Sequence, residues 1–270
     1  MQRADQVLAN PVAPGVLAAP SFTVGGVIAK TFSTWARNLV PFALLMAISQ
    51  LPPYVVDLLV DHAIYGTWNP TMAQVLAQPD DSRALAAAVQ MIVVSVLLAF
   101  VRVGALSHGA IQHLAGKKVS TGALLEVALR RAWPAVVAGA LFAFTVLVGT
   151  VALVVPGVIV LAALAVAIPV AVVERKGGPA STSRSFELTR GKLLAILGCF
   201  AVMGLVACVV TAVTAMLPDV LGGSLAAGIF GFAVYAAMAP LWELLPGVLY
   251  SVLRATKDGL DPASLARVFE

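Results

Sequence analysis

A run of 42 residues, positions 132–173, carries no charged side chain. As a single α-helix it would be about 63 Å long, because each residue adds about 1.5 Å, whereas the hydrocarbon core of a bilayer is only about 30 Å thick. The run is therefore expected to cross a membrane twice. Pro156-Gly157 near its middle predicts the turn, since proline lacks a backbone donor and glycine accepts turn conformations.

Other charge-free gaps predict four more crossings, because a charge at the bilayer centre is costly and about 20 apolar residues suffice to span it. Composition agrees: 60% of the chain is apolar and only 11% is charged, which excludes a soluble globule. We expect an all-α polytopic membrane protein with one membrane domain over 21–254, a disordered tail over 1–20 and a cytoplasmic tail over 255–270. The six expected spans are about 38–60, 84–107, 134–155, 157–173, 193–217 and 223–248.

The positions of the cations predict the orientation of these spans. One face collects fifteen of the 17 lysines and arginines, namely Arg3, Lys30, Arg37, Lys117, Lys118, Arg130, Arg131, Arg175, Lys176, Arg184, Arg190, Lys192, Arg254, Lys257 and Arg267. The other face has Arg83 beside five aspartates. The positive-inside rule therefore predicts that both termini are cytoplasmic. Anionic lipid then accounts for the net charge of +4, and we expect no nucleic-acid partner.

Three stretches that precede outward-going spans predict amphipathic helices lying in the cytoplasmic interface. They are Ser21–Arg37, Ser120–Trp133 and Ser181–Lys192, and each opens with a serine that can cap a helix. In the first, an apolar stripe that includes Val27, Ile28 and Trp35 is expected to face the membrane. The three stretches could be an internal repeat of one surface helix and one hairpin. Alternatively, they only reflect the cations expected before any outward-going span.

Apart from Asp57 near the end of the first predicted span, two charged residues fall inside the predicted spans, Arg102 in the second and Glu243 in the sixth. Both are expected near the cytoplasmic end, so an ion pair between them is one hypothesis. The alternative is that Arg102 reaches up to the headgroups while Glu243 stays neutral or faces water. His108 and His113 are five residues apart, which does not place them on one helical face, and we expect no metal site. The sequence has no nucleotide-binding loop or nucleophile motif, so we expect no catalytic residue and no cofactor.

A pattern at the fourth span and its exit resembles a known family. It consists of Pro156-Gly157, Pro169, Glu174, Gly178, Arg184-Ser185, Leu188 and Gly191, and a second segment of Tyr250, Leu253-Arg254, Asp258-Gly259, Leu265 and Val268-Phe269. Both are similar to the glycerophosphoryl diester phosphodiesterase membrane-domain family of bacterial multipass proteins. The resemblance implies a stand-alone form of the membrane part in the inner membrane of a bacterium, without the phosphodiesterase barrel and without its activity.

The residues just beyond the fourth span have two interpretations. Glu174 and Arg184 are close enough in sequence to pair across the turn and to fix the third surface helix, with Pro156 and Gly157 as part of the same structural motif. Alternatively, Arg184, Arg190 and Lys192 form a pocket for a phosphorylated headgroup on the cytoplasmic side.

Three functions remain open from the sequence. The first is a non-enzymatic membrane protein that binds or organises lipid, anionic headgroups above all, or that accompanies another membrane protein or a second copy of itself. The second is a transporter or lipid flippase, for which proline and glycine in the fourth and sixth spans are the motivating feature. The third and least favoured is a membrane enzyme acting on lipid phosphodiesters.

Overall fold

A computed structural model describes residues 22–68, 70, 74, 82–152, 154–216, 220, 224–260 and 262–267. All regular secondary structure in these residues is helical, and six helical segments are long and apolar enough to cross a membrane. The expected all-α, multi-pass membrane architecture is therefore confirmed. The expected N-terminal tail over 1–20 lies outside the described residues.

The spans are built from the longer helices, several of which are interrupted. Residues 39–65 form α3, and α5 runs from Ser82 to Leu114. The third and fourth crossings consist of α7 (Ala132–Ala152), α8 (Val154–Ala163) and α9 (Ala167–Val173). The fifth is α11 (Leu193–Ala215), and the sixth is divided into α13 (Leu225–Met238), α14 (Pro240–Glu243) and α15 (Leu245–Asp258).

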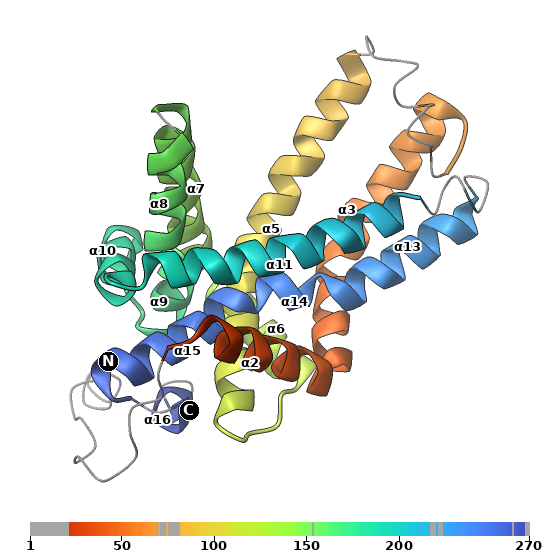
Figure 1. Cartoon of the computed structure of the whole chain (residues 1–270). Helices are drawn as coiled ribbons and strands as arrows, with labels where there is room; N and C mark the ends of the chain where they lie inside the picture. Colours follow the sequence, from red (N-terminus) through yellow and green to blue (C-terminus); the bar gives the residue numbers. More distant parts are fainter. Residues whose placement is uncertain are drawn as a thin grey trace.

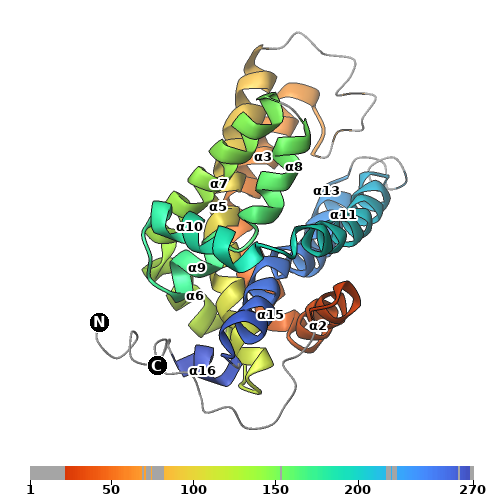
Figure 2. The ribbon, with the colours of Figure 1, turned by 60° about the vertical axis from the view of Figure 1, so that its left-hand side comes forward.

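Three helical hairpins extend from one common base (Figures 1 and 2). They are formed by α3 with α5, by α7 with α8, and by α11 with α13. The largest cluster of buried apolar side chains lies in the base, where Phe42, Leu106, Val170 and Leu249 are fully covered. Helix α13 also packs along α3 beyond the base, where the rings of Tyr54 and Phe232 stack with their centroids 4.5 Å apart. Large apolar side chains are exposed along the hairpins, as expected of surfaces in contact with lipid.

Three shorter helices precede the first, third and fifth spans, in the order expected from the sequence. They are α2 (Val24–Arg37), α6 (Thr121–Arg130) and α10 (Gly178–Thr189). Ser120 caps α6 as expected, because its hydroxyl accepts a hydrogen bond from the backbone N–H of Ala123 at 3.3 Å. Ser181 is not a cap: α10 begins three residues earlier, and the buried Ser181 hydroxyl donates to the carbonyl of Gly178 at 2.7 Å.

The apolar stripe of α2 faces the protein and not a membrane. Val27 is 1% exposed, and Ile28 and Trp35 pack against the main core. The indole N–H of Trp35 donates to the backbone carbonyl of Ala237 in α13 at 2.8 Å. The expectation that this stripe lies against lipid is therefore wrong, because the stripe packs α2 against the base.

The turn between α7 and α8 lies earlier than expected. Helix α8 begins at Val154, so Pro156 and Gly157 lie in its first turn, where a proline is tolerated because the first backbone N–H groups have no partner within the helix. Gly157 instead permits close packing of the hairpin. A Cβ atom at Gly157 would lie 2.8 Å from the Cα of Thr150 on α7, which is closer than real atoms approach.

The C-terminal segment is part of the base. Helix α15 continues to Asp258, ten residues beyond the expected end of the sixth span. Gly259 ends it in the left-handed conformation with φ 67°, and α16 (Pro262–Ala266) follows. Leu260 and Leu265 join the main core. The structure thus differs from the expected boundary at 254, because these side chains supply apolar surface that covers the base.

Candidate functional site

Arg102 and Glu243, the two ionisable residues expected inside the spans, are in direct contact. Nη2 of Arg102 lies 2.8 Å from Oε1 of Glu243, and Nε lies 3.0 Å from Oε2, so the pair is bidentate. The two residues are only 3% and 8% exposed. Bidentate geometry is the strongest form of an arginine–carboxylate interaction, and it compensates part of the penalty of burying two charges.

The sequence positions this ion pair through a close approach of two helices. Arg102 lies on α5, and Glu243 is the last residue of the short α14, just before α15. A Cβ atom on Gly247, in the first turn of α15, would lie 2.6 Å from the Cα of Ser107 on α5. Glycine at this position therefore lets α15 lie against α5, one helical turn beyond the ion pair.

A second charged cluster surrounds Glu174 at the end of α9. Its side chain is 3% exposed and binds cations from three different segments. Arg254 Nη1 lies 2.8 Å from Oε1, Lys176 Nζ lies 3.0 Å from Oε2, and Arg184 Nε lies 3.7 Å from Oε2. The hydroxyl of Tyr250 donates to Oε1 at 3.2 Å. The structure thus brings Glu174 and Arg184 together, and Glu174 joins α10 to α15.

Arg184 extends the cluster through two further carboxylates. Its Nη2 lies 2.6 Å from Oδ2 of Asp258, and its Nη1 lies 3.1 Å from Oε2 of Glu187. Burial lowers the pKa of this guanidinium, but the hydrogen bond to Glu187 and the charges of Asp258 and Glu174 outweigh burial, and the net shift is upward. Arg184 is therefore held as a cation whose charge is balanced within the protein.

The sequence pattern identified Glu174 and Arg184 but not their partners in α15. Tyr250, Arg254 and Asp258 recur every four residues, which places them on one face of that helix. This spacing was the available signal, and the resemblance included all three residues. The spacing alone does not identify the segment that this face of α15 contacts.

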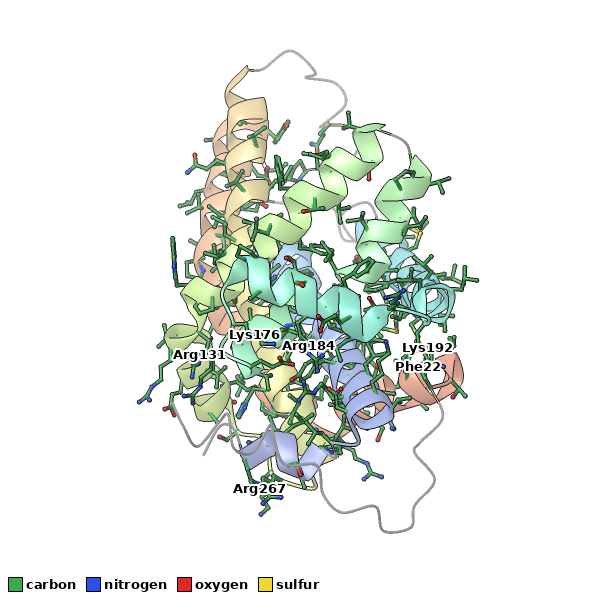
Figure 3. The ribbon with its side chains drawn as sticks, turned by 90° about the vertical axis from the view of Figure 1, so that its left-hand side faces the viewer. Phe22, Arg131, Lys176, Arg184, Lys192 and Arg267 are labelled. Carbon is green, nitrogen blue, oxygen red and sulfur yellow. The ribbon has the colours of Figure 1, made fainter. Side chains whose placement is uncertain are left out.

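The three cations expected to form a headgroup pocket have different environments. Arg184 is engaged by carboxylates, as described above, whereas Arg190 is exposed at the end of α10. Lys192 places its Nζ 6.0 Å from the ring centroid of Phe22 (Figure 3). All three lie near enough to Lys257 for their charges to act on it, and Lys257 itself donates to the carbonyls of Glu187 and Arg190.

Among the described residues, no group of three or more histidine, cysteine or acidic side chains is arranged to hold a metal ion. Nδ1 of His113 lies 3.0 Å from the side-chain nitrogen of Asn38, and His108 is buried on α5. These two histidines thus have separate surroundings.

No protein-family model, no curated protein and no solved structure matches this chain.

Proposed function

We propose that this multi-pass protein is a non-enzymatic component of the bacterial inner membrane that binds and organises anionic lipids. The observation that carries the proposal is the collection of cations at one level of the base. Figure 3 shows Arg131, Lys176, Arg184 and Lys192 at this level, with the apolar hairpins on one side and Arg267 on the other. Cations at the level of the headgroups attract anionic lipid, each contributing about 1 kcal/mol.

The exposed apolar residues beside these cations support the same placement of the membrane surface. Trp133 is 77% exposed at the start of α7, and Leu194 is 85% exposed at the start of α11. Tryptophan is enriched at membrane interfaces, because its ring is apolar while its N–H reaches polar headgroups. In this proposal both termini are cytoplasmic and the base contacts the inner leaflet.

Membership of the glycerophosphoryl diester phosphodiesterase membrane-domain family remains part of the proposal. The two segments that carry the resemblance contact each other through Glu174–Arg254 and Arg184–Asp258. This contact supports a structural role for the shared residues in that family. A second copy of the chain or another membrane protein on the exposed hairpin surfaces is compatible with this function.

The test is the lipid that remains with the protein after mild detergent extraction. We expect mass spectrometry to find anionic phospholipids enriched at least threefold over their share of the whole membrane. An unrelated six-span protein extracted in parallel controls for the detergent. A lipid composition equal to that of the bulk membrane would contradict the proposal.

A transporter or flippase is the second candidate, and interrupted helices are the observation that favours it. The fourth crossing is interrupted between Ala163 and Ala167. In the sixth crossing Pro240 and Pro246 lie on either side of Glu243, and each removes one backbone N–H from the helix. Nη1 of Arg102 makes no hydrogen bond to any residue that the structure describes, which is costly for a buried donor. Interrupted helices at membrane depth are typical of transporter binding sites. A saturable flux or lipid flip in reconstituted vesicles that is lost in Glu243→Gln would favour this function.

A further inference from the structure

A cavity of about 350 Å³ lies between α5, α6 and the segment that follows α9. Its wall is formed by His108 and Gln112 of α5, by Glu126 of α6, and by three arginines, Arg130, Arg131 and Arg175. A volume of this size lies within the range of small-molecule sites. A smaller cavity of about 180 Å³ shares His108 and Gln112, and adds Lys117 and Lys118 to its wall.

The charge around the larger cavity is strongly positive. Three guanidinium groups face one carboxylate, that of Glu126, among the residues that line it. Oε1 of Glu126 already lies 3.2 Å from Nε of Arg130, which is four residues further along the chain, and both side chains are exposed. Burial lowers the pKa of the Arg131 guanidinium, and the charges of Arg175 and Arg130 lower it further. Arg131 is thus repelled by the neighbouring cations Arg130 and Arg175, and a bound anion would relieve this repulsion.

The backbone at Arg175 supports a role for its side chain. Arg175 has φ 54°, the one left-handed residue other than glycine in the described part of the chain. It directly follows Glu174, which caps α9, at the position where helices commonly place glycine. A side chain in this conformation costs about 1 kcal/mol or more, and such strain is concentrated at functional sites.

The cavity lies at the expected level of the phospholipid headgroups. Leu129 is 80% exposed beside Arg130, and the exposed Trp133 lies two residues beyond Arg131. In Figure 3, Arg131 lies level with Lys176 and Arg184, where the apolar hairpin joins the base. Apolar anchors next to clustered guanidinium groups match a ligand with acyl chains and an anionic headgroup.

We propose that this cavity binds the phosphate group of an anionic phospholipid, with Arg131 and Arg175 as its main ligands. Guanidinium groups bind phosphate oxygens in bidentate fashion, which gives geometric specificity as well as charge. The inference rests on the proposed lipid-binding function and names a site for it that differs from Arg184, Arg190 and Lys192. Arg184 is neutralised by carboxylates, whereas the arginines of the cavity outnumber the single carboxylate there.

The experiment titrates the purified full chain in detergent with short-chain phosphatidylglycerol and follows bound lipid by native mass spectrometry. Phosphatidylcholine and inorganic phosphate are titrated in parallel. We expect Arg131→Gln/Arg175→Gln to weaken binding of phosphatidylglycerol at least tenfold, since each substitution removes the charge-assisted hydrogen bonds of one guanidinium. The matched control, Arg37→Gln/Arg267→Gln, also removes two exposed arginines from the expected cytoplasmic face and should retain affinity within about twofold.

A second variant fills the cavity and keeps every arginine. Ala123 lines both cavities, so Ala123→Phe should weaken phosphatidylglycerol binding while leaving the net charge unchanged. Thermal unfolding without added lipid checks that each variant is folded. Tenfold weaker binding in both the arginine and the filling variant, with the control unaffected, supports the site.

Three results would overturn the inference. Equal losses in the arginine variant and the control would mean diffuse attraction, and the proposed lipid-binding function would survive without this site. Tighter binding of inorganic phosphate than of phosphatidylglycerol would assign the cavity to a soluble anion. Equal affinity of the unaltered chain for phosphatidylglycerol and phosphatidylcholine would remove both the site and the proposed function.

Discussion

Oε1 of Glu174 lies 2.8 Å from Nη1 of Arg254, across 80 residues of sequence, and both side chains are almost completely buried. This contact joins the end of the fourth crossing to the last long helix of the chain. Because Arg184 also reaches Glu174 and Asp258, helices α9, α10 and α15 are held together by one charged cluster. The cluster lies in the base from which all three hairpins extend.

We expect Glu174→Gln to destabilise the protein by about 3–5 kcal/mol, the usual effect of removing one partner of a buried ion pair. The substitution keeps the shape of the side chain but leaves buried Arg254 with the more exposed Asp258, 3.1 Å away, as its remaining carboxylate partner. Thermal and denaturant unfolding in one detergent would measure the loss.

Glu187→Gln is the matched control, because Glu187 pairs with the same Arg184 from an exposed position. Exposed pairs contribute about 0–1 kcal/mol, so this variant should unfold close to the unaltered chain. Equal effects of the two substitutions would show that the buried carboxylate has no special role.

The ion pair between Arg102 and Glu243 makes a separate prediction. In a double-mutant cycle with Arg102→Met and Glu243→Gln, the double variant should be more stable than the sum of the single losses predicts. A coupling of about 1 kcal/mol or more is expected for side chains in contact. Stability is measured by unfolding in detergent, and purely additive losses would mean that the pair does not form in the membrane protein.

The sequence was sufficient to predict the fold class, and it offered this intramembrane pair as one of two alternatives. Charges are excluded from the bilayer centre, so charge-free runs locate the crossings, and the two charges within the spans have few partners other than each other. Helix ends were less accurate. Helix α3 continues to Tyr65, past Asp57 and Asp61, because a helix does not have to stop where the membrane does.

The contacts of the base could not be predicted in the same way. Tyr250 and Arg254 reach Glu174 only because α15 packs beside α9, and no local pattern specifies which faces of two distant helices meet. The side toward which the apolar stripe of α2 faces could not be predicted for the same reason. Amphipathic spacing shows that one side of a helix is apolar, but the spacing is the same whether that side meets lipid or protein.

The close approach of α7 and α8 predicts a strong effect of a single methyl group. Gly157→Ala would place Cβ 2.8 Å from backbone atoms of Thr150, so the hairpin must shift, and we expect destabilisation by about 1–3 kcal/mol. Unfolding temperature in detergent is the measurement. At Gly204 on α11 a Cβ would meet nothing within 4 Å, so Gly204→Ala should be neutral or stabilising by up to about 1 kcal/mol through helix propensity. A neutral Gly157→Ala would contradict the packing of this hairpin.

The orientation of the chain is tested by the accessibility of single cysteines. The natural cysteines, the buried Cys199 and the exposed Cys208, are first replaced by alanine and serine. Gln74 follows the first crossing, whereas Lys118 follows the second and Arg190 follows the fourth, and all three are exposed. Because cations gather on the cytoplasmic side, Gln74→Cys should react with a membrane-impermeant maleimide in intact spheroplasts. Lys118→Cys and Arg190→Cys should react only after the spheroplasts are lysed. The reverse pattern would place the cationic base outside the cell, where the cytoplasmic leaflet that attracts its arginines and lysines is out of reach.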